Sequence, residues 1–250
     1  MTNDRSHLFC FAYAVLSLSS ILQAEETCPV ELKLLLSPPA IQAVMTSFKF
    51  EHEAKGQVYF FDTPELDLLR QGVIVRVRQG TNNDLTVKVR GAEGNQQVDS
   101  QLRPHFPCEI DRTGAGANTS YSVQRKYKTP YVPELGNEIA SLLSRPQQRL
   151  LQEAQVSIDW TRLTRIASIR STKWEANVQS PFRKFSLELW EWPAASILEL
   201  STRVAPDAGA SGYAELQRVV AIRSLPLSPS QGTKTRIVLE AVTQHTSTAR

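Results

Sequence analysis

Several residue types and motifs are scarce in this 250-residue chain, and each scarcity excludes a class of protein. The 3 cysteines and 4 histidines do not have the spacing of a zinc site or of a Cys-x-x-Cys redox motif. The sequence also lacks a Gly-rich phosphate loop and a Gly-x-Ser-x-Gly elbow. The net charge is only +3, from 28 basic and 25 acidic residues. Proteins that bind duplexes carry a much denser positive field, so we expect no nucleic-acid partner.

One long apolar run lies at the N-terminus, from Leu8 to Leu22, and is followed by Gln23-Ala24 and then by acids. This order predicts a secretory signal peptide, residues 1–24, cleaved after Ala24. The run is shorter than the roughly 20 residues that span a bilayer. We therefore expect an exported protein, periplasmic or secreted, with no membrane association after signal cleavage.

Cleavage of the signal leaves two cysteines, Cys28 and Cys108. In an oxidising compartment an even pair can form a disulfide, and the alternative is two separate buried thiols. No linker or low-complexity tract interrupts the remainder. We expect one domain over residues 25–245 and a disordered tail over residues 246–250.

Alternating apolar and polar residues predict a protein built mainly from strands, of the α+β kind, as a barrel or a sandwich. Residues 73–79 and 85–91 are joined by a turn and predict a hairpin. Residues 114–118 predict a loop. Other predicted strands are 30–34, 58–61, 156–160, 164–172, 185–190 and 197–204, and predicted helices are 134–143, 147–154 and 212–223.

The polar positions of the predicted hairpin are paired cations: Arg76 with Arg78, and Lys88 with Arg90. Residues at i and i+2 project from one face of a strand, so up to four cations crowd together. Like charges facing each other across strands are destabilising, and a bound anion would relieve that cost. Phosphate suits Arg and Lys. The alternative is a solvated basic sheet face with surface salt bridges.

Acidic residues occupy polar positions in other predicted strands, namely Glu31 beside Lys33, Glu188, and Glu199. A carboxylate next to bound phosphate is unfavourable unless a cation lies between them. Mg²⁺ or Mn²⁺, which bridge carboxylate and phosphate oxygens, would supply that cation.

Four segments carry a resemblance to a known family. They are Glu31-Leu32-Lys33, Phe60-Phe61-Asp62-Thr63-Pro64, Leu69 to Arg78, and Leu85-Thr86-Val87-Lys88-Val89-Arg90-Gly91. In order, they resemble the end of the Glu-x-Glu-x-Lys signature, the Tyr-Phe-Asp-Thr-Pro segment, the Leu-x-x-x-Gly-x-x-Leu-Arg-x-Arg strand and the Leu-Thr-x-Lys strand of CYTH domains, the triphosphate tunnel metalloenzymes. Leu198-Glu199-Leu200-Ser201 and Gly232-Thr233-Lys234 resemble its Glu-x-Glu and Ser-Lys elements more loosely.

The resemblance implies a closed tunnel barrel of eight antiparallel strands with a few short flanking helices. With the predicted signal peptide, it indicates a divergent, exported member of the family. It also implies that basic side chains bind inorganic triphosphate, polyphosphate or an organic phosphate, and that carboxylates hold Mg²⁺ or Mn²⁺. The phosphate ligands implied are Lys33, Arg76, Arg78, Lys88 and Arg90, with Arg165 and Arg170 added from suitable strands. The metal ligands implied are Glu31, Glu199 and Glu188.

Two positions depart from the family pattern. Pro29 stands where the first Glu of the signature belongs, and Ser201 stands where the second Glu of Glu-x-Glu belongs. Binding should survive the loss of these carboxylates better than metal-dependent hydrolysis, since Mg²⁺ must be held by oxygen ligands. Three hypotheses follow: a metal-dependent triphosphatase, a non-catalytic phosphate-binding module, and a structural barrel whose charges face solvent.

Overall fold

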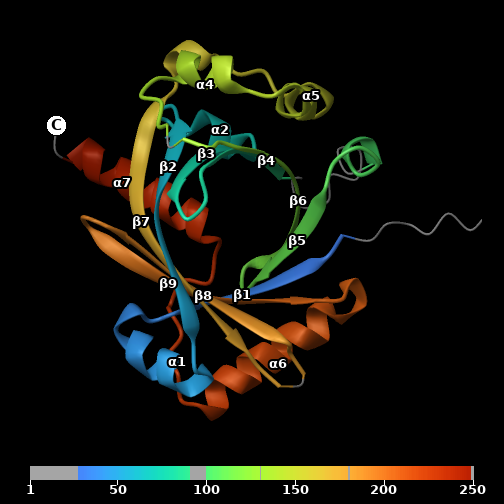
Figure 1. The fold of residues 1–250 in the computed structure, drawn as a ribbon, viewed down its shortest axis with the longest axis vertical. Helices are drawn as coiled ribbons and strands as arrows, with labels where there is room; N and C mark the ends of the chain where they lie inside the picture. The colour runs from blue at the N-terminus through green and yellow to red at the C-terminus, as the bar shows by residue number, and fades with distance from the viewer. Residues whose placement is uncertain (1–27, 91–99, 130, 180, 249–250) are drawn as a thin grey trace, which may run out of the picture.

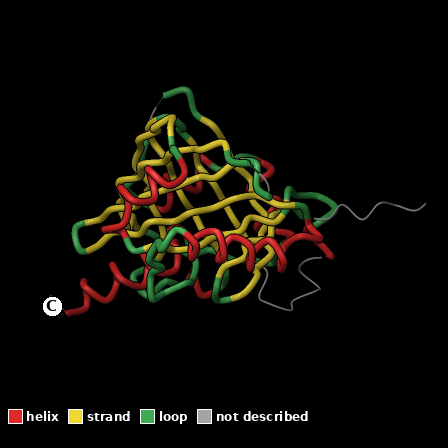
Figure 2. The backbone as a smooth tube through the Cα atoms, turned by 90° about the horizontal axis from the view of Figure 1, so that it is seen from below, coloured by secondary structure: helices red, strands yellow, loops and turns green. Residues whose placement is uncertain are grey.

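The computed structural model describes residues 28–90, 100–129, 131–179 and 181–248, and the predicted signal peptide lies outside them. The described chain forms a closed barrel with short helices around it (Figure 1). Seen at 90° to that view, the strands cross one another in the middle of the molecule and helices lie along them (Figure 2).

Nine strands make up the barrel within the described residues, in the order β1-β5-β6-β4-β3-β2-β7-β8-β9, and β9 pairs with β1 to close it. Their bounds are β1 Val30–Leu36, β2 Glu51–Asp62, β3 Val73–Gly80, β4 Asp84–Arg90, β5 Cys108–Thr113, β6 Gly116–Lys126, β7 Thr164–Asn177, β8 Lys184–Trp192 and β9 Ala195–Val204.

The expectation of eight antiparallel strands is therefore corrected: the barrel has nine strands, and β1 runs parallel to β5. The predicted hairpin of β3 and β4 is confirmed. The hairpin of β5 and β6 is not among the predictions. Its turn, between Thr113 and Gly116, is shorter than the loop predicted over residues 114–118.

Short helices connect the strands and cover the outside of the barrel. Their bounds are α1 Ile41–Phe48, α2 Asp67–Arg70, α4 Gly136–Leu142, α5 Arg145–Glu153, α6 Gly209–Ile222 and α7 Lys234–Thr248, with 3₁₀ turns η1 Pro38–Ala40, η2 Trp160–Arg162 and η3 Pro206–Ala208. The strand predicted at 156–160 is wrong, since η2 begins within it. Helix α7 extends three residues into the predicted tail at 246–250.

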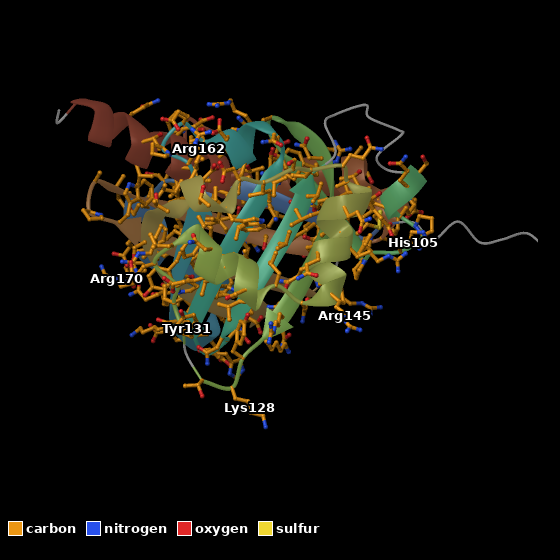
Figure 3. All side chains as sticks on the ribbon, turned by 90° about the horizontal axis from the view of Figure 1, so that it is seen from above. His105, Lys128, Tyr131, Arg145, Arg162 and Arg170 are labelled. Atoms are coloured by element: carbon orange, nitrogen blue, oxygen red, sulfur yellow. A yellow bond between two sulfur atoms is a disulfide. The ribbon has the colours of Figure 1, made fainter. Side chains whose placement is uncertain are left out.

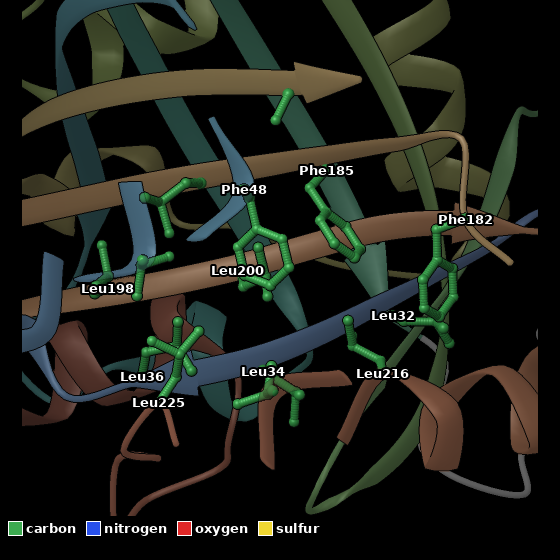
Figure 4. Packing of buried hydrophobic residues seen from close by; sticks show 14 of the residues in the cluster. Leu32, Leu34, Leu36, Phe48, Phe182, Phe185, Leu198, Leu200, Leu216 and Leu225 are labelled. Atoms are coloured by element: carbon green, nitrogen blue, oxygen red, sulfur yellow. The ribbon is translucent and has the colours of Figure 1, made fainter. Parts of the chain in front are cut away.

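The apolar core lies mostly outside the barrel wall. Leu32, Leu34 and Leu36 of β1 point outward and pack with Phe48 of α1 and Leu216 of α6 (Figure 4). A second cluster joins the outer faces of β3 and β4 to α4 and α5. Because the helices cover the apolar face, the alternate residues of each strand line the lumen.

One end of the lumen is apolar and is closed by α7. Val238 and Leu239 of α7 pack against inward residues that include Phe60, Ile74 and Trp190. We call this part of α7, with Val238 and Leu239, the plug. The polar part of the lumen lies beyond it. None of the described helices is long and apolar enough to cross a membrane.

Cys28 and Cys108, the cysteines expected to pair, are joined by a disulfide. It links the segment before β1 to the first residue of β5. These are the two strands whose parallel pairing spans only Val30↔Ile110 to Leu32↔Arg112. The disulfide therefore lies at the shortest strand pairing of the barrel wall.

Candidate functional site

The register of β3 and β4 places all four predicted cations on the inner face without setting like charges opposite each other. Arg76 faces Thr86, Arg78 faces Asp84, and Lys88 faces Ile74. The repulsion expected across the hairpin is thus reduced, because each cation has a neutral or acidic residue opposite it.

A first group of charges gathers where β1, β5 and β4 meet in the lumen. Lys33 Nζ lies 2.9 Å from Glu31 and 2.5 Å from Asp111. Lys88 Nζ lies 2.9 Å from the other oxygen of Asp111 and 3.9 Å from Glu109. Arg90 is 4.0 Å from Asp111. We call these six residues the β1–β5 cluster.

The β1–β5 cluster perturbs the pKa of its members. Burial favours the neutral form of Asp111, but Lys33 and Lys88 outweigh burial and hold the pKa of Asp111 far below its usual value. Burial lowers the pKa of Lys33, yet Asp111 and Glu31 more than reverse that effect and raise it. Burial, with the charge of Glu31, raises the pKa of Glu109. Such opposed shifts in one cavity are typical of binding and catalytic sites.

Glu109 and Asp111 were missed from the sequence. Their signal was present in the i, i+2 spacing of two acids within Cys108–Thr113, the same spacing that revealed the cations. This spacing was not interpreted, because Cys108–Thr113 is not among the segments predicted as strands.

A second group of charges lies nearer the plug. Lys234, at the start of α7, forms an ion pair with Glu188 and lies 2.8 Å from Glu199. Ser171 Oγ and Trp190 Nε1 donate to Glu188 at 2.8 and 2.6 Å. Burial opposes ionisation of Glu188, but Lys234 and these donors lower its pKa to about 2. We call Lys234, Glu188 and Glu199 the plug triad.

Arg76 differs from the other lumen cations. Arg78 donates to Asp84 at 2.8 Å, whereas Arg76 has no ion pair with any described carboxylate and reaches only the Thr86 hydroxyl, at 3.4 Å. Its Nε is buried without a partner among the described residues. Burial, with the nearby charge of Arg78, lowers the pKa of Arg76 to about 10. Arg76 therefore carries an unneutralised positive charge into the lumen.

Two predicted ligands lie apart from these groups. Arg170 pairs with Glu191 on the outer face, with 65% of its side chain exposed, and projects from the molecule in Figure 3. Arg165 pairs with Glu134, 2.9 Å away, and its guanidinium lies over the Tyr59 ring. The structure does not bring these two arginines to the lumen. Arg170 is adjacent in sequence to the inward Ile169, and a register shift in the pairing of β2 with β7 sets Arg165 opposite the outward Phe61.

The predicted metal ligands divide between the two charge groups. Glu31 joins Glu109 and Asp111, whose ligand oxygens lie within 4.8 Å of one another. Three carboxylates of this kind fit a hard divalent cation that retains several waters, once Lys33 and Lys88 leave Asp111 for a bound anion. Glu188 and Glu199 lie outside this group of three, and Lys234, whose helix packs in the lumen, lies between them. Ser201, where a carboxylate was expected, donates to Glu31 at 3.3 Å.

The lumen has an opening of about 360 Å³ beside the plug. Arg90, Thr233 and Arg236 are among the residues that line it. Arg90 donates to the Thr233 hydroxyl at 3.2 Å. This contact ties the start of α7 to β4 and places basic side chains at the opening.

The family model of the CYTH domain matches residues 29–189, more than half of the chain, and the chain belongs to this family. The match contains β1 to β7 and most of β8, and therefore nearly all of the strands that carry the lumen charges. No curated protein matches the chain by sequence.

Solved structures share the fold. One is a candidate adenylyl cyclase from Hippeastrum, described as having a dominant triphosphatase activity. It has a TM-score of 0.57 and 17% identity, and the alignment covers 84% of this chain and 95% of that one. Another is a candidate adenylate cyclase from Bacillus halodurans, with a TM-score of 0.55, 13% identity and coverages of 84% and 97%. At these identities the likeness concerns the fold.

Proposed function

We propose that the lumen binds a triphosphate-type anion, such as inorganic triphosphate, polyphosphate or an organic phosphate, and hydrolyses it with a divalent metal. The observation that carries this proposal is Arg76, a lumen guanidinium without a carboxylate partner among the described residues. Arg78 lies on the same strand, Lys88 and Arg90 lie on the neighbouring β4, and Lys33 projects into the lumen from β1. A chain of phosphates would supply the negative charge that this set of cations lacks.

The β1–β5 cluster would hold the metal, through Glu31, Glu109 and Asp111, as Mg²⁺ or Mn²⁺. A bound divalent ion would neutralise charge on the transferred phosphoryl group. Lys33 and Lys88 are tied to Asp111 in the described structure. When the carboxylates bind a cation instead, both ammonium groups become available to phosphate. Metal and phosphate should therefore bind cooperatively.

Phosphate release from tripolyphosphate tests this proposal. We expect phosphate release with Mg²⁺ or Mn²⁺ and none in EDTA. Asp111→Asn should lose this release, because Asp111 is a proposed metal ligand and contacts both Lys33 and Lys88. Arg170→Ala, on the outer face, is the matched control and should retain activity. Failure of tripolyphosphate to bind under any condition would refute the proposal.

A second candidate function is a non-catalytic phosphate-binding module, which Pro29 and Ser201 favour because two expected carboxylates are absent at these positions. It predicts tripolyphosphate binding in EDTA and no phosphate release with any divalent metal. Isothermal titration and a release assay on the same preparation separate the two functions. A structural barrel predicts no effect of Arg76→Ala on either readout.

We also propose that the protein is exported, on the strength of the apolar run that ends before Ala24. Expression of the full sequence in a secreting host should yield a chain that begins at Glu25, identified by intact mass. A chain that retains Met1 to Ala24 in the soluble cell fraction would contradict export.

A further inference from the structure

Lys234 lies between Glu188 and Glu199, two lumen carboxylates that the family resemblance implies as metal ligands. Its ammonium forms an ion pair with one oxygen of Glu188 and lies 2.8 Å from Glu199, and only 14% of its side chain is exposed. The other oxygen of Glu188 accepts hydrogen bonds from Ser171 and Trp190. The ammonium also lies 4.6 Å from the centre of the Trp190 ring. A metal ion that approached both carboxylates at bonding distance would overlap this ammonium.

The position of Lys234 is unfavourable for its own helix. It is the first residue of α7, where the helix dipole disfavours a cation. Its position is therefore explained by the two carboxylates rather than by helix stability. Glu199, which is only 4% exposed, would be costly to bury without a counter-ion. The following residues of α7 pack in the lumen, so the helix holds the ammonium in place.

We infer that Lys234 replaces a divalent cation between Glu188 and Glu199, so that the chain itself supplies the positive charge at this position. The metal of the proposed function is then confined to Glu31, Glu109 and Asp111. The inference refines that proposed function, but it concerns metal binding alone. It makes Lys234 a positioning residue that sets one positive charge between two carboxylates and holds the start of α7 against the lumen wall.

The test is the number of Mn²⁺ ions bound per chain, measured from the electron paramagnetic resonance signal of free Mn²⁺ in the absence of any phosphate. We expect Glu199→Gln to bind as many ions as the unaltered chain. Lys234→Met should bind one additional ion, because the carboxylate pair becomes available. That gain should disappear in Lys234→Met/Glu199→Gln. Lys234→Arg, which retains the charge, is the matched control and should show no gain.

Two results would overturn the inference. One is a bound Mn²⁺ that Glu199→Gln removes from the otherwise unaltered chain, and the other is a folded Lys234→Met variant that gains no ion. Near-UV circular dichroism reports whether each variant is folded, and if Lys234→Met is not, the Glu199→Gln comparison decides. The Mn²⁺ count does not depend on tripolyphosphate binding, so failure of the proposed function remains a separate result.

Discussion

Arg76 shows at the residue scale how the lumen differs from an ordinary protein interior. A buried charge is normally paired, since the cost of removing it from water is several kcal/mol (about 3–5 kcal/mol when a partner is lost). Arg78 follows this rule, because it forms an ion pair with the buried Asp84. Arg76 does not, and only a hydroxyl is within its reach. An anionic ligand would form the ion pair that Arg76 lacks among the described residues.

Arg76→Ala should weaken tripolyphosphate binding about 10- to 100-fold, the loss expected for one charge-assisted contact of roughly 1.5–3 kcal/mol. It should not lower the free energy of unfolding, because no carboxylate is left unpaired. Titration calorimetry and urea unfolding measure the two effects.

Arg78→Ala is the informative comparison. It leaves the buried Asp84 with the Thr86 hydroxyl alone, so we expect a loss of about 1–3 kcal/mol in the free energy of unfolding. Equal stability of the two variants would contradict the distinction between a paired and an unpaired lumen cation.

The acids of the lumen predict how stability depends on pH. The pKa of Glu188 lies at about 2, below its ordinary value of 4.5, because Lys234 and two hydrogen-bond donors outweigh its burial. A lowered pKa contributes stability that is complete above the unfolded value and is lost as the pH falls toward the folded value. We expect urea unfolding to show a decline that begins near pH 4.5 and continues toward pH 2.

Asp111, whose pKa is also lowered, should contribute in the same direction. Glu188→Gln should make the decline shallower, whereas the exposed Glu65→Gln should leave it unchanged. A stability that is flat between pH 4.5 and pH 2.5 would show that these carboxylates are not paired in solution.

At the scale of elements, the pairing of β1 with β5 is the shortest in the barrel wall. It is parallel and spans three residue pairs, yet Glu31, Glu109 and Asp111 all lie on these two strands. The disulfide between Cys28 and Cys108 begins this pairing and closes a loop with a sequence separation of 80. It therefore fixes the strands that carry the acidic residues.

Removal of the disulfide, as Cys28→Ser/Cys108→Ser, should lower the free energy of unfolding by about 2–5 kcal/mol, the range for bonds that close long loops. Urea unfolding of the variant and of the oxidised and reduced natural chain measures the change. An unchanged midpoint on reduction would mean that hydrogen bonds alone hold β1 against β5.

At the scale of the whole molecule, the apolar face of the barrel is turned outward under the helices and the charged face is turned inward. In the absence of ligands, carboxylates in the lumen form ion pairs with ammonium groups. A bound metal would take the place of the ammonium groups beside the carboxylates, and bound phosphate would take the place of the carboxylates beside the ammonium groups. The binding of either ligand would therefore favour the binding of the other.

We expect Mg²⁺ to tighten tripolyphosphate binding by roughly tenfold, and tripolyphosphate to tighten Mn²⁺ binding by a similar factor, because such coupling is reciprocal. Titration calorimetry in EDTA and in excess metal measures it. Glu109→Gln should reduce the coupling more than it reduces binding in EDTA. An affinity for tripolyphosphate that is the same with and without metal would refute this coupling.

Much of the site could be predicted from the sequence, because a strand places residues i and i+2 on one face whatever its neighbours are. That rule selected Arg76, Arg78, Lys88 and Arg90, and the structure directs all four into the lumen. Arg165 and Arg170 were added from suitable strands without such a pair, and neither reaches the lumen, because the inward face of β7 and its register shift depend on the pairing with β2.

The sequence by itself determined the class of fold, the paired cations and the family, because these depend on local periodicity and on motifs within one segment. Only the tertiary structure decided that β5 inserts beside β1, that Asp111 lies between Lys33 and Lys88, and that Lys234 lies between Glu188 and Glu199. Each of these contacts joins residues far apart in the chain. Strand order and register set such contacts, and no local pattern encodes them.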